Sequence, residues 1–321
     1  MKKLVSMKTN KLIKLFFTFV VLISILFMNS CSQPEKKSSE NAEKPKLKLG
    51  LFSYSYHLAF GRHADYKPTV KMDLFQFMDR AKEMGFDGIQ IDITHLESHD
   101  SAYLAKLTKY AEDKGFYIEY GSTGIEEGHT LSELEVARQL HAPIMRTYMG
   151  FSRYDKKTDV KKEIEKAISV LNNLKPKLKE YGIKLAIENH CDATADELLQ
   201  IIKRVNDPNI GVCVDLGNFM INLENPTESV EKLAPYIVTT HFKDYNSTMM
   251  NWGFKTYGVA LGDGAIDLNA ILKILTEKSK LDRIMLEIPI EPEGDEAATL
   301  KKENDAVEKS ALYARNVLGI K

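Results

Sequence analysis

Short apolar runs alternate with longer amphipathic stretches along most of the chain from Leu47 onward. The runs are aliphatic on consecutive positions, which is typical of strands buried on both faces of a parallel sheet. The stretches between them repeat apolar residues three and four positions apart, which predicts helices. Strands are predicted at 47–52, 85–92, 116–120, 143–147, 183–187, 209–214, 236–240 and 283–286.

The predicted helices lie at 69–84, 101–114, 131–140, 160–181, 194–205, 227–233, 267–279 and 300–317. Pro176 is predicted to kink or break the longest of them. Glycine separates a charged helix end from the next strand at Gly85, Gly115 and Gly182, as expected of left-handed helix caps. Eight alternating strand and helix units favour an α/β protein with a closed (β/α)₈ TIM barrel. An open doubly wound sheet is the alternative, although neither GxGxxG nor GxxxxGK[ST] occurs in the sequence.

The first thirty residues have a different character from the rest. Five lysines and no acidic residue precede an apolar stretch from Leu15 to Met28, which predicts a signal peptide over residues 1–30. Ser30-Cys31 at its end resembles the lipobox of bacterial lipoproteins, and this resemblance implies cleavage before Cys31 and attachment of lipid there. Residues 31–46 are rich in Ser, Lys, Glu and Pro and predict a flexible tether, so the catalytic domain is expected over 47–321.

The leader predicts an exported protein that is lipid-anchored to a bacterial membrane, facing the periplasm or exposed on the cell surface. An ordinary secretory signal or an N-terminal anchor helix is the alternative, and either also places the protein outside the cytoplasm.

Net charge argues against polyanionic partners, and the cysteine content bears on possible disulfides. The net charge is -1, and loss of the five leader lysines leaves 39 basic and 45 acidic residues, a net of about -6. A mildly acidic chain does not suit nucleic acid or another polyanion. Cys191 and Cys213 are expected to be small buried side chains. A single disulfide between them is the alternative in an oxidising compartment.

Polar residues end four strands of the second half of the chain. Each of these strand ends carries one acidic or imidazole side chain: Glu188, Asp215, His241 and Glu287. The carboxyl ends of barrel strands meet at one mouth, so these side chains are expected to point at one another. Without a cation the three carboxylates would repel and raise one another's pKa values. One divalent metal resolves the repulsion, and the mixed oxygen and nitrogen ligands suit Mn²⁺, Co²⁺, Mg²⁺ or Zn²⁺.

The motifs around these residues resemble those of the sugar phosphate isomerase/epimerase family, the xylose isomerase-like TIM barrels. They are Ile-Glu-Asn-His at 187–190, Val-Asp-Leu-Gly-Asn at 214–218, His-Phe-Lys-Asp at 241–244, Gly-Asp-Gly-Ala-Ile-Asp at 262–267 and Leu-Glu-Ile at 286–288. The resemblance covers the chain from about Leu47. It implies a barrel in which Glu188, Asp215, His241 and Glu287 hold one divalent metal. It also implies that Glu188 and Glu287 flank the substrate as proton-transfer groups.

The resemblance implies a metal-dependent sugar isomerase or epimerase that removes a proton beside a carbonyl and forms an enediolate. A 3-keto-glycoside lyase or hydrolase would use the same enolate chemistry and is the first alternative. A sugar-binding lipoprotein without turnover and a phosphodiesterase of the endonuclease IV kind are the others. The expected partner is a small sugar or keto-sugar, and the sequence leaves the oligomeric state open.

Further residues are expected to shape the sugar pocket, with a local structural role as the alternative for most of them: His57, Arg146, His190, Asn218, Lys243 and Trp252. Asp244 is expected to orient Lys243. Two positions depart from the ketose epimerases of the family, which usually have His where this chain has Asn218 and Arg where it has Ser247. The resemblance therefore supports the barrel and the metal more firmly than it supports ketose epimerisation.

Overall fold

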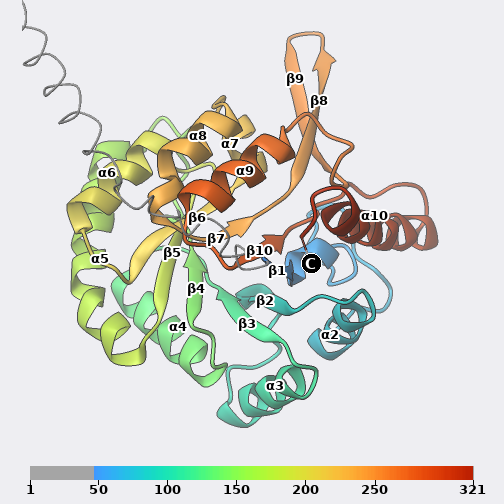
Figure 1. Cartoon of the computed structure of the whole chain (residues 1–321), viewed down its shortest axis with the longest axis horizontal. Helices are drawn as coiled ribbons and strands as arrows, with labels where there is room; N and C mark the ends of the chain where they lie inside the picture. Colours follow the sequence, from blue (N-terminus) through green and yellow to red (C-terminus); the bar gives the residue numbers. More distant parts are fainter. Residues whose placement is uncertain (1–46, 321) are drawn as a thin grey trace, which may run out of the picture. The chain divides into compact units, whose positions relative to one another are not determined.

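The computed structural model describes residues 47–320 and contains a ring of eight parallel strands surrounded by helices (Figure 1). The strands follow one another around the ring in the order β10, β1, β2, β3, β4, β5, β6, β7. Their bounds are β1 Lys48–Phe52, β2 Gly88–Asp92, β3 Tyr117–Gly121, β4 Ile144–Thr147, β5 Lys184–Glu188, β6 Ile210–Asp215, β7 Ile237–His241 and β10 Arg283–Leu286.

The ring closes between β7 and β10 through the residue that follows β7. The backbone N–H of Phe242 donates to the carbonyl of Met285 over 2.8 Å, and the N–H of Glu287 donates back to the carbonyl of Phe242 over 3.3 Å. The predicted (β/α)₈ TIM barrel is thus confirmed, and the open sheet was the wrong alternative.

The signal peptide, the lipidation site Cys31 and the tether predicted from the sequence lie outside the described residues. Within residues 47–320, no helix has both the length and the apolar character needed to cross a membrane. Cys191 and Cys213 are free thiols, so the structure contains no disulfide between them.

Eight longer helices follow the strands around the outside of the ring. They are α2 Leu74–Glu83, α3 Ser101–Asp113, α4 Glu127–Gln139, α5 Val160–Tyr181, α6 Ala195–Val205, α8 Pro226–Leu233, α9 Leu268–Lys278 and α10 Glu296–Asn316. The turns η1 Ser53–Tyr56, η2 Ile93–His95 and η3 Ala234–Tyr236, and the short helix α7 Leu216–Ile221, connect them to the strands.

Local sequence explains where several helices begin. Asp73 and Thr194 accept hydrogen bonds from the first turns of α2 and α6 in capping boxes. Helix α5 continues from Val160 to Tyr181 past Pro176, so the predicted break at this proline was wrong. The apolar face of α5 remains buried on both sides of Pro176, at Leu174 and Leu178, and this packing outweighs the lost backbone hydrogen bond.

A β-hairpin occupies part of the segment that the sequence left as a long loop after His241. Strands β8 (Asp244–Met250) and β9 (Gly253–Val259) pair antiparallel and project beyond the ring of helices (Figure 1). The hairpin was missed because its residues do not alternate between apolar and polar, since only Asp244 of its two strands is buried and half of the strand residues are exposed.

Candidate metal centre

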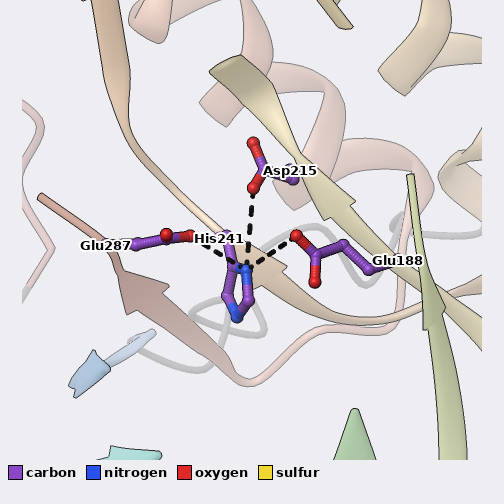
Figure 2. A group of neighbouring side chains, drawn as sticks. All are labelled: Glu188, Asp215, His241 and Glu287. Atoms are coloured by element: carbon purple, nitrogen blue, oxygen red, sulfur yellow. Dashed lines mark ion pairs between the residues drawn. The ribbon is translucent and has the colours of Figure 1, made fainter. Parts of the chain in front are cut away.

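The four strand-end residues predicted as ligands converge in one buried cluster (Figure 2). Glu188, Asp215 and His241 are the last residues of β5, β6 and β7, and Glu287 directly follows β10. Each offers one ligand atom, and these atoms all lie within 4.8 Å of one another. The Nδ1 atom of His241 lies 3.0 Å from Glu287, 3.3 Å from Glu188 and 3.7 Å from Asp215.

Parallel register brings these residues to one level of the barrel. Glu188 pairs with Cys213, and Asp215 pairs with His241. Because adjacent strands end at the same edge, their last side chains share the space at the mouth. Asp215 also caps α7, since its carboxylate accepts from the N–H of Asn218 over 2.9 Å.

The hydrogen bonds around His241 leave its Nδ1 free to act as a ligand. Its Nε2–H donates to the side-chain oxygen of Gln90 over 2.8 Å, because the amide nitrogen of Gln90 donates to Glu119 over 3.0 Å. Nδ1 then faces carboxylate oxygens. Burial lowers the pKa of His241, but Glu188 and Glu287 outweigh burial and hold that pKa well above its usual value, so without a cation Nδ1 carries a proton that a bound metal would replace. Nδ1 of His241, Oδ2 of Asp215 and Oε2 of Glu188 are buried and make no hydrogen bond of good geometry, although Lys243 forms an ion pair with Oδ2 of Asp215 and Arg146 forms one with Oε2 of Glu188. Three buried carboxylates that converge on one imidazole nitrogen fit a divalent cation.

Two buried cations border the cluster. The Nε atom of Arg146, on β4, lies 3.0 Å from Oε2 of Glu188, and Nζ of Lys243 lies 2.7 Å from Asp215 and 3.1 Å from Glu287. The three carboxylates therefore have different surroundings, with Arg146 on one side and Lys243 on the other.

These charges shift the pKa values of the cluster. Burial raises the pKa of Glu188, but Arg146 and His241 outweigh burial and hold it well below its usual value. Burial is likewise outweighed at Glu287, where Lys243 and His241 lower the pKa to about 2. Burial lowers the pKa of Lys243, but Asp215 and Glu287 outweigh it and hold that pKa well above its usual value. Both glutamates are consequently ionised, and Lys243 is protonated, at neutral pH.

Of the residues predicted to contact the sugar, three touch the cluster. They are Arg146 and Lys243, described above, and Asn218, whose side-chain amide donates to Oε1 of Glu188 over 3.2 Å. Asp244 does not orient Lys243 by a hydrogen bond. Its carboxylate accepts from the backbone N–H groups of Gly262, Gly264 and Ile266 and ties the base of the hairpin to the following turn.

The other three lie apart from the ligand atoms. His190 is exposed and stacks on Tyr148, with 4.1 Å between ring centroids. His57 is buried, and its Nδ1 lies 3.5 Å from Glu303 of α10, while burial lowers its pKa to about 4. Trp252 lies in the turn of the β8–β9 hairpin with its side chain exposed, so the structure does not bring it into the cluster. Sugar contacts by all six residues stay predictions.

Sequence reasoning missed the residues that hold His241 in place. Gln90 of β2 and Glu119 of β3 are fully buried neighbours in register, and Thr239 donates to Glu119 over 2.7 Å. The available signal was a polar residue inside an otherwise apolar strand, at both Gln90 and Glu119. A buried polar side chain needs a partner, so such positions indicate a network rather than plain core.

Comparison with known proteins agrees with this architecture. Residues 78–315 match the model of a family described as the xylose isomerase-like TIM barrel. The chain is 26% identical over 275 residues to a 3-oxo-isoapionate decarboxylase of Pectobacterium atrosepticum, covering 84% of this chain and 96% of that protein. It is 23% identical over 228 residues to a D-psicose 3-epimerase of Agrobacterium fabrum, covering 61% of this chain and 79% of the epimerase.

A solved structure of D-psicose 3-epimerase in the presence of D-fructose superimposes with a TM-score of 0.66 at 18% identity. The match covers 85% of this chain and 100% of that one. At this identity the likeness establishes the shared fold. The two relatives matched by sequence, by their names, act on sugars or sugar derivatives.

Proposed function

Because the chain belongs to the xylose isomerase-like TIM barrel family, we propose that it is a divalent-metal-dependent sugar isomerase or epimerase. The observation that carries the proposal is the convergence of Glu188, Asp215, His241 and Glu287 in one buried cluster, with ligand atoms within 4.8 Å of one another. Buried carboxylates this close repel one another, and a cation between them removes the repulsion.

We infer that the two glutamates are the groups that transfer protons to and from the sugar. Figure 2 shows Glu188 and Glu287 on opposite sides of the imidazole of His241. A divalent cation held there would stabilise negative charge on the carbonyl and hydroxyl oxygens of the sugar. One ionised glutamate accepts the proton from the carbon beside the carbonyl. The other glutamate is ionised as well, so it must first take up a proton from Lys243 or from solvent; delivery of that proton to the opposite face inverts the carbon. Return of the abstracted proton by the same glutamate to the neighbouring carbon isomerises the sugar.

Arg146 and Lys243 control the ionisation of Glu188 and Glu287. Arg146 keeps Glu188 ionised before the reaction, and Asn218 holds its other oxygen by a hydrogen bond. Lys243 does the same for Glu287 and can donate a hydrogen bond to an oxygen of the substrate that gains charge.

The test is proton NMR in D₂O with metal-reconstituted protein and a panel of ketoses, aldoses and 3-keto-glycosides. We expect deuterium to enter beside the carbonyl of one substrate, and we expect chelator to abolish the exchange. Glu188→Gln and Glu287→Gln each remove a ligand charge as well, so they are assayed at metal concentrations that saturate each variant, where they should bind sugar but lose turnover. Full activity in either variant would exclude it as the proton-transfer group, and no exchange on any sugar would favour a binding protein without turnover.

Elimination or decarboxylation of an oxidised sugar is the second candidate. Two observations favour it over ketose epimerisation: a protonated lysine beside Glu287, and Asn218 where ketose epimerases usually have His. In elimination, a glutamate takes the proton beside the keto group, and the bond from the neighbouring carbon to the glycosidic oxygen breaks. Lys243 is the acid that can protonate the departing oxygen. The products separate the candidates, since elimination gives an unsaturated ketone and a free alcohol, decarboxylation releases CO₂, and epimerisation conserves the formula.

A further inference from the structure

The tip of the β8–β9 hairpin is an exposed apolar surface that no function described above uses. The exposed fractions of its side chains are 99% for Trp252, 77% for Met249, 73% for Phe254 and 55% for Met250. These four residues lie within six consecutive positions, at the end of the element that projects beyond the helices (Figure 1). Scattered exposed apolar residues are ordinary, but a contiguous group at the end of an arm indicates a binding surface.

The apolar side chains lie on both faces of the hairpin. Met249 is paired directly with Phe254, so these two side chains share one face. Met250 is the next residue along β8 and therefore points to the opposite face. Packing against the surface of a protein would cover one face and leave the other in water. Immersion in lipid covers both faces together.

Polar side chains replace apolar ones directly behind the tip. The hydroxyl groups of Ser247 and Thr256 lie 3.0 Å apart, and those of Thr248 and Tyr257 lie 3.2 Å apart on the other face. Residues 245–259 contain one charged side chain, Lys255, and no acidic one, in a chain that has 45 acidic residues. An apolar tip followed by hydroxyl, tyrosine and lysine side chains matches the order from the hydrocarbon of a bilayer to its headgroups.

The N-terminal sequence predicts that the chain is attached to a membrane. The signal peptide and Cys31 predict a lipid anchor, and fifteen residues separate Cys31 from Leu47. Fully extended, they span at most about 50 Å, which is about the diameter expected of a domain of this size. Leu47 precedes the amino end of β1 and the hairpin follows the carboxyl end of β7, so the tether has to cover about the height of the barrel. With the tether close to full extension, a chain anchored at Cys31 can bring the hairpin tip to the same bilayer.

We propose that Met249, Met250, Trp252 and Phe254 insert into the interface of the lipid bilayer to which the chain is anchored. Insertion would give the domain a second attachment besides the lipid. The mouth of the barrel, where the hairpin begins, would then be held at a fixed orientation to the membrane. This role replaces the sugar contact that the sequence predicts for Trp252.

The single tryptophan of the chain makes the test direct, because all tryptophan emission comes from the tip. The full chain is reconstituted into phosphatidylcholine and phosphatidylglycerol vesicles, with and without bromine on the acyl chains. We expect the emission of Trp252 to move to shorter wavelength in vesicles, and we expect brominated lipid to quench most of it. The double variant Met249→Ser, Phe254→Ser keeps the reporter and should lose most of the quenching.

A matched control moves the reporter away from the hairpin. Trp252→Phe combined with Tyr154→Trp places the indole on an exposed position between β4 and α5. Its emission should stay unquenched by brominated lipid, although the same chain is attached to the same vesicles. Equal quenching of both reporters would mean that the whole domain lies in lipid, and this would overturn the specific role of the tip.

Other results would also overturn the proposal. Emission typical of indole in water, unchanged by brominated lipid, would show that the tip stays in solvent. A shift to shorter wavelength that needs no vesicles but grows with protein concentration would identify a second copy of the chain as the partner. A shift that needs sugar and metal but no lipid would make the hairpin a lid over the site.

Discussion

The two halves of the barrel contribute differently to the candidate metal centre. β5, β6, β7 and the residue after β10 supply the four side chains that converge. β1, β2 and β4 supply side chains that contact those four. Phe52 stacks on the ring of His241 with 4.6 Å between centroids, Gln90 accepts from its Nε2, and Arg146 pairs with Glu188.

The comparison teaches that a carboxylate at a strand end is not sufficient for a ligand. Asp92 is a buried carboxylate at the end of β2, as Asp215 is at the end of β6. Its Oδ1 accepts from the backbone and the hydroxyl of Thr94, and its Oδ2 lies 3.9 Å from Arg146. Asp92 is thus engaged in capping η2 and is not among the converging ligand atoms, whereas Oδ2 of Asp215 lies 3.7 Å from Nδ1 of His241 inside that cluster.

Replacing each of these two aspartates by asparagine tests the difference between a ligand and a capping carboxylate, and it has the largest expected effect. Asp215→Asn removes a ligand charge and should weaken metal binding by more than about 100-fold, because even outer partners of metal ligands cost about 10- to 100-fold. Asp92→Asn keeps the oxygen that caps η2 and should bind metal close to the wild-type level. Isothermal titration with Mn²⁺ and Zn²⁺ measures both, and equal losses in the two variants would contradict the division.

Lys243→Met should destabilise the metal-free protein. Removal of the lysine leaves Asp215 and Glu287 buried without their cation, and loss of one partner of a buried pair costs about 3–5 kcal/mol. A divalent metal would neutralise the same carboxylates, so the difference from wild type should shrink when metal is present. Urea unfolding with chelator and with saturating Mn²⁺ measures this. The same loss of stability in both conditions would mean that Lys243 and the metal do not share these carboxylates.

Gln90→Leu tests the support from the first half of the barrel. Without its acceptor, Nε2 of His241 no longer fixes the tautomer that presents Nδ1, so metal affinity should fall about 10- to 100-fold. Nitrogen NMR of the metal-loaded protein should show the altered tautomer, because it reports whether Nδ1 of His241 still binds the cation while Nε2 carries the proton. Glu119→Gln is the control, since its amide oxygen still accepts from Gln90 and Thr239, and its metal affinity should stay close to that of wild type. Unchanged tautomer and affinity in Gln90→Leu would remove Gln90 from the site.

Much of the fold could be predicted because its signals are local. Each buried strand is a short aliphatic run with turn residues around it, and β10 was predicted with its observed bounds, Arg283–Leu286. The four converging residues were found in the same way, as polar side chains that abruptly end such runs. The TIM barrel then follows from counting the units, because a ring requires each strand end to face the same mouth.

The remaining features depend on contacts between distant residues. Gln90 reaches His241 across 151 positions, and Thr239 reaches Glu119 across 120 positions, so neither pair is visible in a local pattern. The β8–β9 hairpin is held by cross-strand pairing and by Asp244 rather than by a buried apolar face. The effect of Pro176 also depends on distant contacts, because the packing of α5 on its neighbours decides whether the helix continues past the proline.

Phe52→Leu should give the smallest effect and the finest test of the division between the two halves. The substitution keeps an apolar side chain at a buried position but loses the ring that stacks on His241, an interaction of about 0.5–1.5 kcal/mol. Stability should fall by about 1 kcal/mol, and metal affinity should fall by less than about tenfold, because 1.4 kcal/mol corresponds to tenfold. Phe77→Leu is the control, since Phe77 of α2 is equally buried but packs against Tyr56 and Phe60. It should lose similar stability in thermal unfolding and no metal affinity in titration. If both variants lose stability and neither loses affinity, the first half of the barrel orients His241 through Gln90 alone.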